Sequence, residues 1–218
     1  MGDKYSLKIT NKSSSPDLTF GLYTVAPIEE ASGIYPIAWQ TKALGEGNHI
    51  TFSWSLDFSL QFSAHGAAHG ATWDEGGTPV IVSDGSAATN SAQLGYDKDY
   101  TLALVDGAHP VAPGRVFLDT TSTVPRWTAE KGPSVALAIA TGDGTPVPAI
   151  AGNSGPNLHH MFDLHPTYYL RAGQFTQGEM ADLDTFTDGQ KAVFGKGARY
   201  AAYIFNEDNV WVPDTSPH

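Results

Sequence analysis

Large apolar residues alternate with small polar residues along much of the chain. The longest example has seven large apolar side chains at every second position: Ile50, Phe52, Trp54, Leu56, Phe58, Leu60 and Phe62. A period of two predicts a half-buried strand with one apolar face and one polar face. Because a strand of this length exceeds the usual range, we expect it to bend or to cross between two sheets.

The same alternation predicts further strands, separated by clusters of glycine and proline. They are expected at residues 5–9, 18–22, 100–106, 115–118, 135–140, 158–170 and 198–205. Helical periodicity is weak, and only single helical turns are expected, at residues 27–32 and 178–188. The chain has no internal repeat and no compositional break. We therefore predict one all-β domain over residues 1–218, an antiparallel β-sandwich or distorted barrel with short helical turns in its loops.

Charge and composition narrow the classes of function. The chain carries 12 basic and 23 acidic residues, a formal net charge of −11. Such a chain repels phosphate backbones and anionic membrane surfaces, so we expect neither nucleic-acid nor membrane partners. It has no cysteine, which excludes disulfides, thiolate nucleophiles and zinc–thiolate sites. No signal peptide or membrane-spanning stretch is visible, so a cytoplasmic location is expected, with secretion left open.

Three sequence blocks occur in a characteristic order. They are residues 37–39 (IAW) with 52–59 (FSWSLDFS), then 165–169 (HPTYY) with 173–179 (GQFTQGE) and Asp182, and finally 206–211 (NEDNVW). In order and spacing these blocks resemble the RhiA-like family, which is named for a rhizosphere-expressed protein. The resemblance covers nearly the whole chain, most thinly over residues 64–131. It implies an all-β architecture and a soluble protein, and it transfers no catalytic residues because the family has no established active site.

A segment rich in glycine and histidine, residues 64–77, lies outside the family pattern. It contains His65 and His69, followed by Trp73 and Asp74. The glycines favour a loop, and in an extended chain the two histidines would lie about 13 Å apart, too far to chelate one ion without a turn. Three interpretations of this segment remain open: a polar cluster with an acid–base role, a metal site, and a loop with solvated histidines. Our prediction for the protein includes no metal.

A second histidine-rich segment spans residues 158–166. Strand register would place His159, Asp163 and His165 on a polar face and His160 on the opposite, apolar face. A lone imidazole in an apolar interior can donate or accept a proton inside a pocket. The alternative is a buried structural histidine whose ring is satisfied by a backbone carbonyl.

No nucleophile elbow or phosphate-binding loop is present, so no cofactor is expected. We predict that the protein holds or acts on a small, largely apolar metabolite between its sheets or at their end. An enzymatic form would be a cofactor-independent cyclase or pericyclase of secondary metabolism, with His65, His69 or His160 as the acid–base group. The pocket walls are expected to include Trp54, Trp73, Tyr168 and Trp127.

Two other interpretations stay open. A lectin-like or inclusion-forming protein without chemistry would suit the low charge content and the many serine, threonine and asparagine residues. A metal-dependent β-barrel oxygenase would need two histidines and one carboxylate, for which His65, His69 and Asp74 are the local candidates. Assembly into a homo-oligomer is compatible with either interpretation. The sequence does not choose between binding and catalysis.

Overall fold

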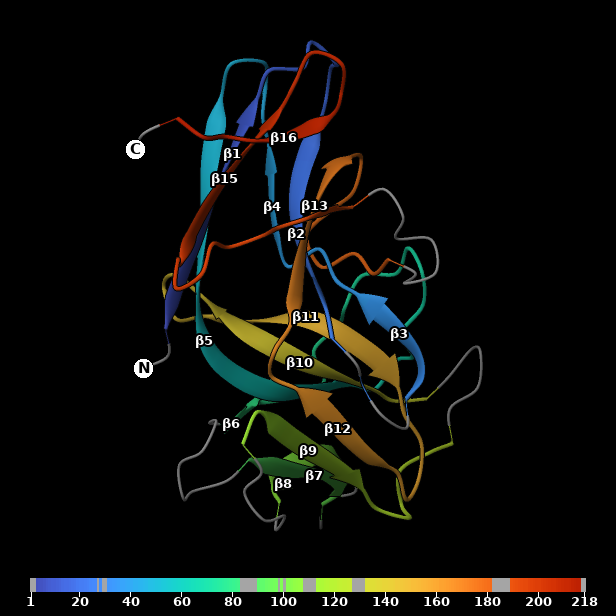
Figure 1. Ribbon diagram of the computed structural model, residues 1–218. Coiled ribbons are helices and arrows are strands. Elements are labelled where there is room, and N and C mark those ends of the chain that lie inside the picture. The colour runs from blue at the N-terminus through green and yellow to red at the C-terminus, as the bar shows by residue number, and fades with distance from the viewer. Residues whose placement is uncertain are drawn as a thin grey trace.

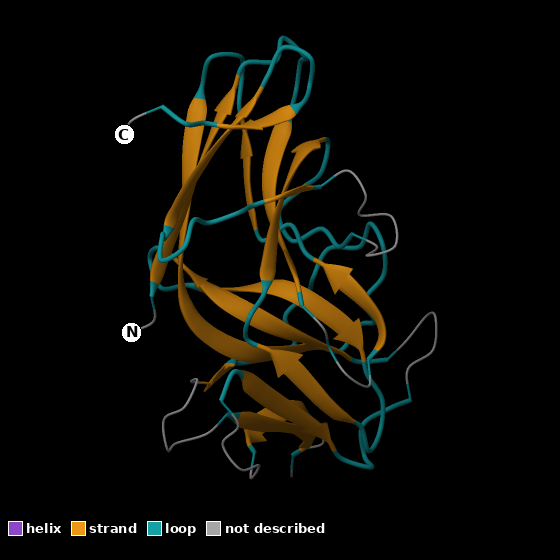
Figure 2. Cartoon of the chain, viewed as in Figure 1, coloured by secondary structure: helices purple, strands orange, loops and turns teal. Residues whose placement is uncertain are grey.

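The computed structural model describes residues 3–26, 28, 31–82, 90–97, 99, 101–107, 113–126, 132–181 and 189–216. These residues form sixteen strands and no helix (Figure 2), which confirms the predicted all-β fold. The segments 27–32 and 178–188, where helical turns were expected, lie partly outside the described residues. Within the described ranges there is no helix long and apolar enough to cross a membrane.

The strands follow one another along the chain with short connections. They are β1 (Lys4–Asn11), β2 (Thr19–Val25), β3 (Ser32–Pro36), β4 (Gln40–Ala43), β5 (His49–Ser63), β6 (Val80–Val82), β7 (Ser91–Tyr96), β8 (Leu102–Asp106), β9 (Arg115–Thr120), β10 (Ser134–Thr141), β11 (Pro146–Asn153), β12 (His159–Asp163), β13 (Thr167–Gly173), β14 (Gln190–Lys191), β15 (Tyr200–Phe205) and β16 (Trp211–Pro213).

Three sheets make up two stacked sandwiches (Figure 1). The large sheet has the order β16-β15-β1-β5-β10-β11-β3, and β6 also pairs with β5. Its β16-β15-β1 part, with the start of β5, faces the β14-β13-β2-β4 sheet, and we call these layers the first sandwich. Its β10-β11-β3 part, with the end of β5, lies against the β12-β9-β7-β8 sheet, and we call these layers the second sandwich. Most neighbours are antiparallel, but β1 pairs with β15, and β7 with β9, in parallel.

Strand β5 belongs to both sandwiches. Its first part pairs with β1 as far as Ser55, and its later part pairs with β10. Between the two parts the register with β10 shifts, so that Leu56 and Asp57 have no partner on β10. A bulge of this kind bends a strand and increases its twist, and β5 curves strongly in Figure 1. The predicted bend of the long strand is confirmed.

The predicted polar face of β5 is solvated only in its first part. Ser59, Gln61 and Ser63 point away from the main core but are still buried. The reason is that residues 64–73, which we call the 64–73 arm, fold back over this face. Small apolar residues of the arm, Ala67 among them, pack there on alanines of β10 and β11.

The two sandwiches share one group of contacting buried side chains but fill it differently. In the first sandwich the contacts between sheets are mainly aromatic, as where Phe20 of β2 meets Phe205 of β15 with ring centroids 5.6 Å apart. In the second sandwich the buried side chains are mostly aliphatic, as at Leu118, Leu137 and Ile139. The cavity described below lies in the first sandwich, among the aromatic rings.

Candidate functional site

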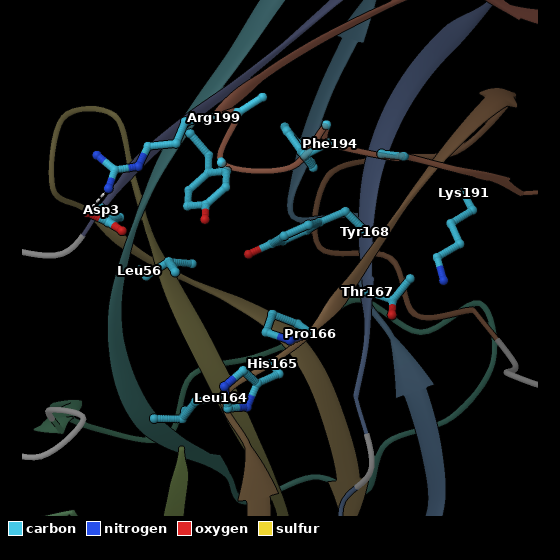
Figure 3. A pocket seen from close by; sticks show the side chains of 15 residues that line it. Asp3, Leu56, Leu164, His165, Pro166, Thr167, Tyr168, Lys191, Phe194 and Arg199 are labelled. Carbon is cyan, nitrogen blue, oxygen red and sulfur yellow. Dashed lines mark ion pairs between the residues drawn. The ribbon is translucent and has the colours of Figure 1, made fainter. Parts of the chain in front are cut away.

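A cavity of about 510 Å³ lies between the two sheets of the first sandwich (Figure 3). We call it the Tyr168 pocket. Its lining comes from the start of β1, from Leu56 in the β5 bulge, and from residues 164–168 around the start of β13. The segment from β14 to β15 supplies Lys191, Ala192, Phe194, Gly195, Gly197, Ala198 and Arg199. Its volume is within the range of about 300–1,000 Å³ typical of small-molecule sites.

Aromatic rings form one wall of the Tyr168 pocket. Strand register places Tyr5 opposite Trp54, and the two rings stack with centroids 5.9 Å apart. Phe194 meets the Tyr5 ring edge to face at 5.4 Å, and Tyr168 contacts Trp54 at 4.8 Å. Such ring pairs favour fixed geometries. The wall is therefore held in place before any ligand arrives.

Apart from Phe194, the connection between β14 and β15 contributes several small residues to the lining. Ala192, Gly195 and Ala198 all contribute to it. A Cβ atom added at Gly195 would lie 3.7 Å from the Cβ atom of Ala198, an ordinary contact distance. The cavity thus depends on small residues in a connection that could hold larger ones.

The hydroxyl of Tyr168 is the most unusual polar group of the pocket. Tyr168 is only 7% exposed, and its oxygen has no hydrogen-bond partner among the described residues. Figure 3 shows this oxygen pointing into the cavity. Burial raises the pKa of the hydroxyl, although the nearby Trp54 indole opposes part of the rise. The group therefore stays protonated and acts as a donor.

Charged side chains surround the rim of the pocket. Arg199 forms an ion pair with Asp3 at 2.7 Å, and Lys191 lies on the opposite side (Figure 3). His165 also lines the rim, and its Nδ1 lies 2.9 Å from Oδ1 of Asp163. Burial alone would raise the pKa of the Asp163 carboxyl, but hydrogen bonds from His165 hold it below its usual value. Asp163 thereby orients the His165 ring.

A second groove of about 470 Å³, which we call the polar groove because serine, threonine and aspartate residues line it, shares Tyr5 with the Tyr168 pocket. The β5 bulge supplies both, with Leu56 in the pocket and Asp57 in the groove. Ser55 donates a hydrogen bond of 2.7 Å to Asp57. Hydrogen bonds from Thr141 and Thr145 lower the pKa of Asp143, also in the groove, to about 2. These carboxylates are already satisfied by neighbouring donors.

The structure does not bring His65 and His69 into the Tyr168 pocket. Both are exposed residues of the 64–73 arm, on the outer face of the second sandwich. His65 Nε2 lies 3.5 Å from Asp74 Oδ2, and both side chains are more than two-thirds exposed, at 75% and 72%. Among the described residues, these included, no three histidine, aspartate or glutamate side chains lie close enough to hold a metal ion. The ligand set of the oxygenase interpretation is therefore not assembled.

The backbone of the arm is firmly anchored even though its histidines are solvated. The side-chain amide of Asn153 accepts a hydrogen bond from the Ala67 N–H at 2.6 Å and donates one to the Ala67 carbonyl at 2.9 Å. The Ser134 hydroxyl donates to the carbonyl of His65 at 2.7 Å. The arm serves as a cover for the sheet.

His160 lies on the apolar face of β12, as strand register predicted. It is 0% exposed, and its Nε2 lies 2.7 Å from the hydroxyl of Ser154. One partner of the ring is thus a side chain of the turn after β11. His160 lines neither the Tyr168 pocket nor the polar groove. An acid–base role for His65, His69 or His160 stays a prediction.

The predicted aromatic wall residues have different positions. Tyr168 lines the pocket, and Trp54 contacts Tyr168 and lines the polar groove instead. Trp73 packs with the 64–73 arm on the outer face of the second sandwich. Trp127 lies outside the described residues.

Sequence reasoning missed several residues of the pocket, among them Tyr5, Phe194 and Arg199. Tyr5 was part of a predicted strand, but only the pairing of β1 with β5 places it beside Trp54. Phe194 lies in a connection without alternation, and Arg199 was part of the strand predicted at residues 198–205, with no signal that it lines a pocket. His165 was noted as part of a polar face and of a family block, a signal that could have drawn attention to it.

Comparison with known proteins places the chain in a family. The family model described as RhiA matches residues 2–214, so the chain belongs to the RhiA family, as its sequence blocks indicated. No curated protein and no solved structure matches the chain.

Proposed function

We propose that this RhiA-family protein binds a small, largely apolar molecule in the Tyr168 pocket. The observation that carries the proposal is the preformed aromatic wall of Tyr5, Tyr168 and Phe194 beside a cavity of about 510 Å³. Ligand sites in proteins are mostly apolar concavities with a few polar groups that fix orientation. The pocket has this composition, with Tyr168 inside and charged groups at the rim.

The small residues of the connection between β14 and β15 provide the test. Ethylnaphthalene, a rigid two-ring hydrocarbon, serves as the probe, and its binding is followed by the fluorescence of the naphthalene ring. We expect saturable binding to the wild-type protein. Gly195→Leu should weaken binding about tenfold or more because the new side chain fills the cavity. Gly195 has no left-handed φ, so its backbone tolerates the change.

Val193→Leu is the matched control on the same connection. Val193 is 64% exposed and does not line the pocket, so this variant should bind the probe like the wild type. Equal affinity in all three proteins, or binding that never saturates, would disprove the proposal.

A catalytic form of the same proposal is favoured by the contact between Asp163 and His165. If Nδ1 donates its proton to Asp163, Nε2 is the ring nitrogen that can accept a proton from a bound molecule. Such a site could isomerise or cyclise a substrate without a cofactor. Proton exchange at the methyl group of bound acetylnaphthalene in D₂O, followed by NMR, tests this directly. His165→Gln should abolish the protein-dependent exchange, and equal exchange in wild type and variant would reject the catalytic form.

A further inference from the structure

Three buried hydrogen-bond donors in the first sandwich lie together without an acceptor. Trp39, Trp54 and Tyr168 form one ring cluster, with centroids 5.8 Å apart for the two tryptophans and 4.8 Å for Trp54 and Tyr168. The two indole N–H groups and the tyrosine hydroxyl have no hydrogen-bond partner among the described residues. Buried polar groups in folded proteins are nearly always paired, so a cluster of unpaired donors requires an explanation.

Only Tyr168 of the three faces the Tyr168 pocket. Its ring is fixed by Trp54 and by an edge-to-face contact with Phe194 at 6.3 Å. The hydroxyl consequently points into the cavity in Figure 3 and is a neutral donor. A partner for its proton has to lie in the cavity itself.

The carboxylates around the cavity are engaged elsewhere. Asp3 pairs with Arg199, and Asp163 with His165. Both pairs lie at the exposed rim, whereas Tyr168 is buried. The acceptor is therefore best supplied by an occupant of the pocket.

We infer that the natural ligand carries a carbonyl-type oxygen on an apolar body, and that the Tyr168 hydroxyl selects it by donating a hydrogen bond to this oxygen. The inference rests on the proposed function and makes it narrower. A site with an unpaired buried donor discriminates against analogues that lack the acceptor, because binding them leaves the donor unpaired. Tyr168 is then a specificity-determining residue, and hydrocarbons of the same shape bind more weakly than the carbonyl compound.

A pair of matched probes separates this inference from simple apolar binding. Acetylnaphthalene and ethylnaphthalene have nearly the same shape, but only the first has a carbonyl oxygen. The wild-type protein should bind acetylnaphthalene about tenfold more tightly. Tyr168→Phe should remove this preference by weakening acetylnaphthalene alone. Tyr96→Phe, which changes an exposed tyrosine away from the pocket, should keep it.

The carbonyl stretching band of bound acetylnaphthalene gives an independent measurement. A hydrogen bond from Tyr168 should shift the band to lower frequency in the wild type and in Tyr96→Phe, and the shift should disappear in Tyr168→Phe. An unshifted band in the wild type, or a shift that survives in Tyr168→Phe, would overturn the inference.

The outcomes also distinguish the two proposals. If both probes bind the wild type and Tyr168→Phe with equal affinity, the pocket binds apolar molecules and the carbonyl inference fails. If neither probe binds the wild type, the proposed function itself fails.

Discussion

His160 and Tyr168 lie on successive strands, β12 and β13, and both are buried, yet their surroundings differ. His160 meets the Ser154 hydroxyl, and the nearby Asn153 side chain binds the backbone of Ala67 through two hydrogen bonds. The Tyr168 hydroxyl has no partner among the described residues and points into a cavity. We call the first surroundings the His160 region and the second the Tyr168 region.

The difference shows that burial of a polar side chain does not by itself identify a functional site. In the His160 region, the His160 ring and the Asn153 side chain are both paired, and the gain is stability. In the Tyr168 region a donor is left unpaired beside a preformed wall, an arrangement that costs stability and is retained where function requires it. The two regions should therefore respond in opposite ways to the removal of a polar group.

The largest effect is expected from His160→Ala. The substitution removes a fully buried ring and deprives Ser154 of a partner, so the free energy of unfolding should fall by about 3 kcal/mol. Urea denaturation measures the change. Binding of ethylnaphthalene to the folded fraction should stay the same. A loss below about 1 kcal/mol would contradict the stabilising role of His160. Impaired probe binding would show that His160 contributes to the proposed binding site.

A smaller loss is expected from Asn153→Ala. The variant leaves both backbone groups of Ala67 without their buried partners, which should cost about 2 kcal/mol. Hydrogen exchange in the 64–73 arm should accelerate at the same time. Asn48→Ala removes an exposed asparagine and should change stability by less than about 0.5 kcal/mol. Unchanged exchange in the arm of Asn153→Ala would contradict its anchoring role.

Alkaline pH distinguishes the regions through Tyr168. Its folded-state pKa is raised by burial above the ordinary value of 10.0, so its contribution to stability is present below that pH and is lost as the pH rises further. In Tyr168→Phe, stability should fall less steeply above pH 10.0, by about 1.4 kcal/mol per pH unit. Burial also raises the pKa of Tyr23, to about 12, so Tyr23→Phe should act similarly up to that pH. Parallel stability curves for wild type and Tyr168→Phe would show that the hydroxyl ionises freely.

The smallest effect, and the one with opposite sign, is expected from Tyr168→Phe at neutral pH. The ring contacts remain while an unpaired buried hydroxyl is lost, so stability should stay constant or rise by up to about 1 kcal/mol. Thermal unfolding of the ligand-free protein measures this. A clear decrease would show that the hydroxyl has a stabilising partner and would remove the contrast with His160.

Strands and their faces could be predicted where the pattern is local. Alternation located β5 and its bend, and the register of β12 placed His160 in the interior. Strand β11 was missed because Pro146 and Pro148 resemble a turn. In the structure the register with β10 shifts at this point, between Ile150 and Pro148. A bulge accommodates a proline that cannot donate to the ladder.

The candidate site could be predicted only in part, because its walls come from distant segments. Tyr168 was expected in a pocket wall, but Tyr5 and Phe194 join it only through strand pairings that alternation does not specify. The composition of residues 64–77 suggested an acid–base role for His65 and His69. Their exposure is decided by how Ala67 and the other small residues of the arm pack on the sheet.

The parallel pairing of β1 with β15 has a consequence for the order of folding. It joins Ser6 to Tyr200, and the Asp3–Arg199 ion pair crosses the same seam. Contacts between residues far apart in the sequence form slowly, because a long loop has to close first. On the ribosome, the second sandwich can assemble from residues already synthesised while β15 is still missing. The Tyr168 pocket, which needs residues as far as Arg199, is therefore completed after the second sandwich, and a nascent chain cannot form the proposed binding site before Arg199 has been synthesised.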